Sequence, residues 1–200
     1  MTPPMFSRLD LRGNETDLRA KLGLLRTATD PAAVTAVREI VAAVADRGDA
    51  AVRELTVRFD GFDPEPLLVE KDELAAALQS CVPAFRQAME FASAQITAYH
   101  ETQREIDVRH EREGVVVRSL VRPVGRAGLY VPGGRAAYPS TVLMTAIPAR
   151  VAGVDDLALC VPAGSDGRVP AATLAAAALC GVEEVYRIGG AHAIAALAHG

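Results

Sequence analysis

Two pairs of consecutive glycines, Gly133-Gly134 and Gly189-Gly190, are the residues of this chain best suited to hold a ligand. Each pair follows a short apolar run and precedes a loop or a predicted helix. Glycine lets a ligand approach the backbone, and free amides at the start of a helix favour phosphate oxygens. Neither pair has the Gly-x-Gly-x-x-Gly spacing of a dinucleotide fingerprint. The glycines therefore predict either a ligand site or simple tight turns.

Tyr130 lies just before the first glycine pair, in an apolar run that continues through Pro132. An aromatic ring at this position could form one wall of a nucleotide slot. The alternative is a core tyrosine whose hydroxyl group is satisfied by a hydrogen bond. The residues by themselves leave both interpretations open.

Histidines and cysteines give no sign of a metal site or a nucleophile. His192 and His199 are seven residues apart, which is about 10.5 Å of helical rise and too far for one zinc ion. The cysteines form no paired motif. Apolar surroundings raise the pKa of a thiol, which keeps it protonated and unreactive. We therefore expect no disulfide, no catalytic residue and no metal ligand among these residues, and reduced thiols at Cys81, Cys160 and Cys180.

The elements that must position the glycines and Tyr130 form a repeating strand and helix pattern. Strands are predicted over residues 127–131, 157–161 and 185–188. Helices are predicted over residues 142–152 and 170–180, and a last helix follows Gly189-Gly190. Strands that alternate with helices form a parallel sheet, and such sheets bind ligands at the carboxyl ends of their strands.

The first part of the chain has a different character. Asp30 and Asp49 are expected to begin two helices, and Gly48 to end the first of them. Further helices are predicted over residues 72–80 and 83–104, and a hairpin over residues 106–119 with its turn at Glu113-Gly114. We expect an α/β fold: an N-terminal arm (1–28), a mostly helical first-domain segment with a hairpin (29–125), and an incomplete Rossmann-like parallel-sheet domain (126–200).

Composition is that of a soluble globular protein. Hydrophobic residues make up 50% of the 200 residues, charged residues 23%, and the net charge is -4. Basic residues are spread along the chain, which argues against a nucleic-acid partner. The longest apolar helical run, residues 171–182, is too short to cross a membrane, and the amino terminus lacks the layout of a secretory signal. We expect a cytoplasmic location.

Several segments, in order, resemble histidinol dehydrogenase. They are residues 47–52, 59–60, 121–134, 138–144, 148–149, 152–154 and 188–197. The resemblance implies an NAD-dependent, zinc-dependent four-electron oxidation of L-histidinol to L-histidine through histidinal, the last step of histidine biosynthesis. It also implies two incomplete Rossmann-like domains and an intertwined homodimer.

The resemblance implies which residues of this chain contact the cofactor and form one wall of its site. Tyr130 matches a tyrosine that contacts NAD in the family, with Pro132 and Pro162 as neighbours. His192 stands where the family has a glutamine, so we expect a retained but altered cofactor contact there. The family's zinc ligands and Glu-His pair lie beyond residue 200, so we expect an amino-terminal portion that is inactive alone.

Two other interpretations remain from the residues themselves. The chain could be a different α/β enzyme that binds a sugar phosphate at the same sheet edge. It could also be a non-catalytic nucleotide-binding or dimerisation module.

Overall fold

The computed structural model describes residues 30–133 and 136–200, so the expected arm over residues 1–28 and also Gly134 lie outside the described residues. The chain divides into two compact units, Met1–Glu39 and Ile40–Gly200, and the division falls within helix α2 (Pro31–Arg47). In the first unit, the backbone N–H of Ala32 donates to Asp30 Oδ1 at 3.0 Å. Asp30 therefore caps α2, as its position before Pro31 predicted.

Three parallel strands form the centre of the second unit. They are β3 (Arg126–Tyr130), β4 (Asp156–Cys160) and β5 (Glu184–Tyr186), paired in the order β3-β4-β5. The connections are the helices α6 (Pro139–Val151) and α7 (Ala171–Leu179), and α8 (Gly190–His199) follows β5. Tyr130 is paired with Cys160, and Cys160 with Tyr186, so the carboxyl ends of the three strands are level.

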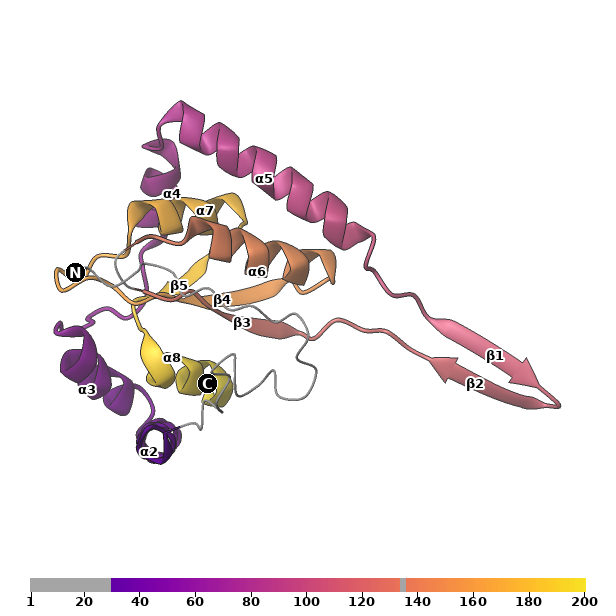
Figure 1. Ribbon diagram of the computed structural model, residues 1–200, viewed down its shortest axis with the longest axis horizontal. Coiled ribbons are helices and arrows are strands. Elements are labelled where there is room, and N and C mark those ends of the chain that lie inside the picture. Colours follow the sequence, from indigo (N-terminus) through magenta and orange to yellow (C-terminus); the bar gives the residue numbers. More distant parts are fainter. Residues whose placement is uncertain (1–29, 134–135) are drawn as a thin grey trace, which may run out of the picture. The chain divides into compact units, whose positions relative to one another are not determined.

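Helices cover both faces of this sheet (Figure 1). One face carries α6 and α7, with α4 (Lys71–Gln79) packed on α7 and α5 (Pro83–Glu101) packed on α6. On the other face α8 contacts β3 and β4, and α3 (Asp49–Asp60) packs on α8. The predicted α/β class with a parallel sheet is confirmed. The expected division between residues 29–125 and 126–200 stays a prediction.

The core explains why the central strand is apolar after its first residue. A parallel sheet is buried on both faces, so its strands read as continuous hydrophobic runs. In β4, Leu157, Ala158, Leu159 and Cys160 are all at most 4% exposed. The alanines of α7 serve the same packing, because Ala175, Ala176 and Ala177 are 0% exposed and their small side chains let neighbouring helices approach closely.

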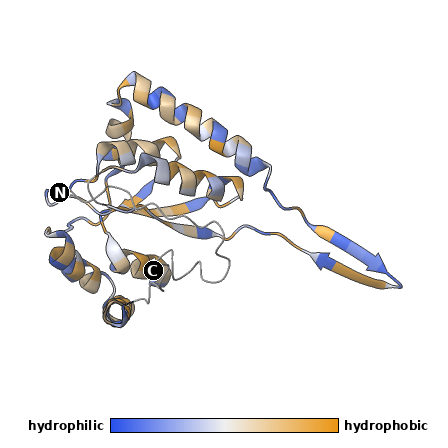
Figure 2. Cartoon of the chain, in the orientation of Figure 1, coloured by the Kyte–Doolittle hydropathy of each residue, from blue (hydrophilic) through white to orange (hydrophobic). Residues whose placement is uncertain are grey.

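The predicted hairpin is present. It consists of β1 (Val108–Arg112) and β2 (Val115–Ser119), which pair antiparallel. Glu113 and Gly114 both have positive φ, 52° and 80°, as a type I′ turn requires. Every residue of both strands is exposed, and Figure 2 shows a mostly polar β1 beside a more apolar β2.

The amino ends of the three sheet strands are joined by one arginine. Arg126, at the start of β3, contacts Asp156 Oδ2 at 3.0 Å and Glu184 Oε2 at 2.6 Å. Tyr186 also donates its hydroxyl proton to Glu184 Oε2, at 2.9 Å. These hydrogen bonds hold the pKa of the Glu184 carboxyl below its ordinary value, and the bond from Arg126 has the largest effect. The ionised form of Glu184 is therefore the one that the fold stabilises.

Replacing Arg126 by methionine should lower the free energy of unfolding at neutral pH by a small amount, at most about 1 kcal/mol, because the ion pairs are solvent-exposed. A carboxyl with a lowered pKa adds stability above its ordinary pKa of 4.5 and loses it as the pH falls through the lowered value. The difference between wild type and variant in urea unfolding should therefore shrink in acid. Arg118→Met, on the exposed hairpin, is the matched control. Equal stability of wild type and Arg126→Met at neutral pH would contradict this account.

Candidate functional site

Pro162, two residues after the end of β4, is held between the two glycine turns. A Cβ atom built on Gly133 would lie 2.4 Å from Pro162 Cγ, and one built on Gly189 would lie 2.5 Å from Pro162 Cβ. Both distances are far inside van der Waals contact, so only glycine fits at either position. The first glycine of each pair therefore makes room for a proline ring of the protein itself. This role differs from the close approach of a ligand that the sequence suggested.

Tyr130 joins the outer strands across the end of the central one. The backbone N–H of Gly190 donates to the Tyr130 hydroxyl oxygen at 3.1 Å, although β3 and β5 are not neighbours in the sheet. The hydroxyl is thus satisfied within the protein, as in the core interpretation. The ring is only half-buried, and it also lines a cavity, as in the ligand interpretation.

This cavity, called the edge cavity below, has a volume of about 520 Å³ and lies at the carboxyl ends of β3 and β4. Small-molecule sites commonly have volumes of about 300–1,000 Å³. Its walls come from the end of α3, the loops after β3 and β4, and the starts of α7 and α8. The lining residues are Asp60, Tyr130, Pro132, Gly133, Ala136, Ala137, Tyr138, Val161, Pro162, Ala163, Gly164, Arg168, Pro170, Thr173 and Gly190.

Few polar groups face the edge cavity. Arg168 brings a positive charge from the loop after β4, and Asp60 brings a carboxyl group from the end of α3. Burial raises the pKa of Asp60 above its ordinary value. The amide of Gly190, at the start of α8, also lies at the wall, but it already donates to the Tyr130 hydroxyl oxygen. Apolar walls with a few convergent polar groups are typical of a cofactor site.

His192 is fully buried, at 1% exposure, and is not among the residues that line the edge cavity. Its Nε2 lies 3.2 Å from Thr56 Oγ1, and the Thr56 hydroxyl donates its proton to the Val52 carbonyl at 2.8 Å. Nε2 must therefore carry the proton that it donates to Thr56. Nδ1 has no hydrogen-bond partner and lies close to Gly190, where a built Cβ would be 3.3 Å away. The direct cofactor contact expected of His192 stays a prediction.

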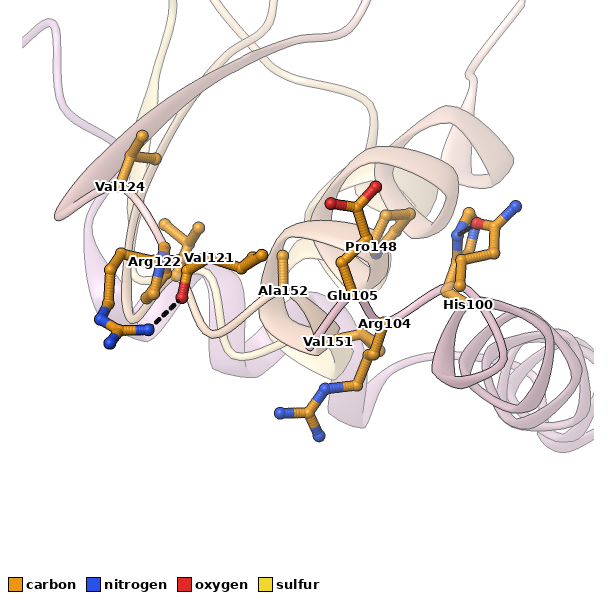
Figure 3. A pocket seen from close by; sticks show the side chains of 12 residues that line it. His100, Arg104, Glu105, Val121, Arg122, Val124, Pro148, Val151 and Ala152 are labelled. Carbon is orange, nitrogen blue, oxygen red and sulfur yellow. Dashed lines mark hydrogen bonds between the residues drawn. The ribbon is translucent and has the colours of Figure 1, made fainter. Parts of the chain in front are cut away.

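A second hollow lies away from the glycine turns, between the end of α5, the segment before β3 and the end of α6 (Figure 3). Its volume is about 550 Å³. Arg122, on its wall, is already engaged, since it forms two bonds with the Asp107 carboxylate at 2.8 and 3.0 Å and one with the Val121 carbonyl. The hollow also lies at the amino end of β3, whereas open α/β sheets bind ligands at the carboxyl end. The edge cavity is therefore the candidate site.

A cluster of metal-binding side chains is not found in the described ranges, and two of the cysteines have raised pKa values. Residues 30–133 and 136–200 hold no group of three or more His, Cys, Asp or Glu side chains that could bind a metal ion. Burial raises the pKa of Cys160 to about 12 and that of Cys180 to about 11, so both thiols stay protonated near neutral pH. All three cysteines are free.

Asp60 and Arg168 were not identified as site residues from the sequence. Asp60 ends a helix some 70 residues before Tyr130, and Arg168 lies in a loop with no recognisable motif. Residues 59–60 are part of the family resemblance, but nothing nearby in the sequence places Asp60 or Arg168 at the cavity, because each enters it only when α3 and the loop after β4 are packed beside the sheet. Tyr130, Pro132 and Pro162, in contrast, were identified, and they line the same cavity.

Comparison with known proteins gives one consistent family. Residues 25–200 match the family described as histidinol dehydrogenase. The histidinol dehydrogenase of Parasynechococcus marenigrum is 55% identical over 162 residues, which are 80% of this chain and 37% of that protein. That of Methanothermobacter thermautotrophicus is 46% identical, over 82% of this chain and 39% of that protein. The crystal structure of histidinol dehydrogenase from Elizabethkingia anophelis matches with a TM-score of 0.80 and 33% identity, over 88% of this chain and 40% of that one.

Gly189→Ala should destabilise the protein by about 1–3 kcal/mol, the usual cost of forcing extra atoms into a packed site. The φ and ψ of Gly189, -128° and -171°, are open to alanine, so the cost arises from the clash with Pro162 alone. Gly125→Ala is the matched control, since a Cβ there meets nothing within 4 Å. Thermal unfolding of the two variants beside wild type is the measurement. A Gly189→Ala midpoint equal to that of Gly125→Ala would refute the steric account.

Stability should fall as the pH drops below the ordinary histidine value, because burial lowers the pKa of His192 from 6.5. Below that pH the unfolded chain binds a proton that the folded imidazole does not, which favours unfolding. The folded ring has no acceptor for a second N–H at Nδ1. His192→Gln should therefore lose less stability than wild type between about pH 7.5 and about pH 5.5.

Asp60 is the other titratable group beside this ring, with Oδ2 4.0 Å from Nε2. Its pKa is raised, so its effect has the opposite direction: stability is lost as the pH rises from 3.8 through the raised value. Asp60 is present in both proteins, so this effect cancels in the comparison. Urea unfolding at several pH values measures the difference, with His110→Gln on the exposed hairpin as control. Parallel pH profiles for wild type and His192→Gln would show that burial of His192 has no such effect.

Proposed function

Because this chain belongs to the histidinol dehydrogenase family, an oxidoreductase family of histidine biosynthesis, we propose that it takes part in the NAD-dependent oxidation of L-histidinol to L-histidine. The proposed reaction passes through histidinal and transfers two hydrides, each to one NAD molecule. The proposed cofactor site is the edge cavity. Family membership also decides against an unrelated α/β enzyme that binds sugar phosphates.

One observation carries this proposal. Tyr130, Pro132 and Pro162, which the family resemblance assigned to the cofactor wall, line a single cavity at the carboxyl edge of a parallel sheet. They come from two different strand ends about 30 residues apart in the sequence. Their convergence supports a nucleotide site at the position where open α/β sheets bind such ligands.

The residues present suit a nucleotide. The half-buried ring of Tyr130 and the rings of Pro132 and Pro162 offer flat apolar surfaces for a base. The guanidinium group of Arg168 suits phosphate oxygens. When bound, NAD would accept the hydride that leaves the substrate carbon. His192 belongs to the proposed site as the buried residue next to Gly190.

The described residues suit a nucleotide but offer no binding site for a zinc ion. No group of three or more potential ligands occurs among residues 30–133 and 136–200. Zinc sites in proteins need three or four such side chains. Any zinc ion of the proposed reaction would therefore have to be held by other residues.

The chain spans 37% and 39% of the length of the two curated relatives. Turnover of L-histidinol, a homodimer and a cytoplasmic location are accordingly proposals about the whole protein. For the residues that the structure describes, no helix has both the length and the apolar character needed to cross a membrane.

Tyr130→Ala should weaken NAD binding by about tenfold or more, because stacking of a base on an aromatic ring is worth about 1–3 kcal/mol. Tyr130→Phe keeps the ring and loses only the acceptor for the Gly190 amide, so its affinity should fall less. Isothermal titration of NAD into the purified protein is the measurement. Tyr99→Ala, exposed on α5, is the control. NAD affinity that survives in Tyr130→Ala, or NAD displaced by ribose 5-phosphate, would contradict the proposed site.

A further inference from the structure

The proposed NAD site needs a group that binds phosphate, and the described backbone of the two glycine turns is already engaged. Gly133 and Gly189 pack against Pro162, where a built Cβ would lie 2.4 Å and 2.5 Å from its ring. The backbone N–H of Gly190 donates to the Tyr130 hydroxyl oxygen at 3.1 Å. Dinucleotide sites on parallel sheets usually bind the pyrophosphate through such glycine turns. The edge cavity therefore needs another group for this purpose.

Arg168 is the one basic side chain at the wall of the edge cavity among the described residues. It is exposed, and its guanidinium group forms no ion pair or hydrogen bond with other described residues. Asp60, the one acidic side chain on the described wall, does not pair with it. A guanidinium group offers five N–H donors in a planar fork that matches the oxygens of a phosphate. The donors of Arg168 are therefore available to a ligand.

The loop between β4 and α7 that carries Arg168 is held by its own hydrogen bonds. The Gly164 N–H donates to the Arg168 carbonyl at 2.9 Å, and the Gly167 N–H donates to the Gly164 carbonyl at 2.8 Å. The Arg168 N–H donates to Asp166 Oδ1 at 3.1 Å. Val169, the next residue, is 4% exposed and belongs to the core. The backbone of Arg168 is thus fixed beside the cavity, and only its side chain has to adjust to a ligand.

Thr173, in the first turn of α7, is a buried polar side chain on the wall of the same cavity. It is only 1% exposed, and its hydroxyl group forms no hydrogen bond with the described residues. The hydroxyl oxygen is not completely enclosed, however, so the small exposed part of Thr173 includes this atom. Native proteins pair nearly all buried polar groups. A hydroxyl that is unpaired and open to a cavity therefore indicates a ligand with a hydrogen-bonding group there.

We propose, on the basis of the NAD site inferred above, that Arg168 and Thr173 form an anion subsite that binds the pyrophosphate of NAD in place of the glycine turns. Both line the edge cavity, as does Pro170 between them at the start of α7. The guanidinium group can donate two parallel hydrogen bonds to phosphate oxygens, and the threonine hydroxyl can donate one. The positive end of the α7 dipole lies at the same wall and favours an anion. The subsite thus belongs to the loop and helix that follow the central strand.

Titration calorimetry of NAD into wild type and variants at several NaCl concentrations tests the anion subsite. Arg168→Gln should weaken NAD binding about tenfold or more, since hydrogen bonds between charged groups are lost. It should also flatten the salt dependence of the affinity, because salt screens an exposed charge pair. Arg168→Lys keeps the charge without the planar fork, so its affinity should lie between those of wild type and Arg168→Gln. Arg118→Gln, on the exposed hairpin, should behave as wild type.

Thr173→Val removes the hydroxyl and keeps the shape of the side chain, so NAD binding should weaken about threefold or more. Thr173→Ser keeps the hydroxyl and should bind NAD nearly as well as wild type. Because the hydroxyl has no partner among the described residues, Thr173→Val should not lower the midpoint of thermal unfolding. A lowered midpoint would show that the hydroxyl is bonded within the protein, which contradicts the inference.

The outcomes separate this inference from the proposed function. NAD binding by Arg168→Gln with the affinity and salt dependence of wild type would overturn the anion subsite, and weaker binding by Tyr130→Ala would then leave the NAD site standing. Weaker binding by Arg168→Gln with an unchanged salt dependence would give Arg168 a purely structural role and overturn the subsite as well. Arg168 is exposed, so its variants decide the question even if Thr173→Val does not fold. Failure of wild type to bind NAD would overturn both proposals.

Discussion

The contact of Pro162 with the two glycine turns is the constraint on which the site depends. The proline follows the central strand, and the backbones at Gly133 and Gly189 approach its ring too closely for any side chain. Because packed interiors do not compress, this contact fixes how far apart the ends of the three strands lie. The hydrogen bond from the Gly190 amide to Tyr130 adds a second connection across the same edge. Together these two contacts hold in place residues that line the edge cavity.

The two edges of the sheet are held by different forces. At the amino edge, Arg126 joins the three strands through exposed ion pairs with Asp156 and Glu184. Such pairs are screened by solvent and contribute little, so this edge tolerates change. At the carboxyl edge, steric fit and partly buried polar groups define the geometry. A ligand site needs that rigidity, since its polar groups must stay in place when the ligand is absent.

Buried polar groups behind the cavity link α3 to α8. His192, in the first turn of α8, bonds Thr56 of α3 and lies against Gly190, whose amide is the one that Tyr130 binds. Asp60, at the end of α3, lines the cavity. The position of α3 therefore decides both what supports the glycine turn and what charge the cavity presents. A helix far from the sheet in sequence thus becomes part of the site.

Local patterns in the sequence were sufficient for the elements: the helix that Asp30 begins, the Glu113-Gly114 hairpin, the strand and helix alternation and the family resemblance all follow from neighbouring residues. The family resemblance predicted Tyr130, Pro132 and Pro162 as cofactor contacts, and all three lie at or just after strand ends. Only the tertiary structure decided that the glycines accommodate Pro162, that His192 is buried and that Asp60 reaches the cavity. The reason is physical: backbone conformation responds to near neighbours, whereas clashes, burial and unfilled hydrogen bonds arise between residues that meet only after folding.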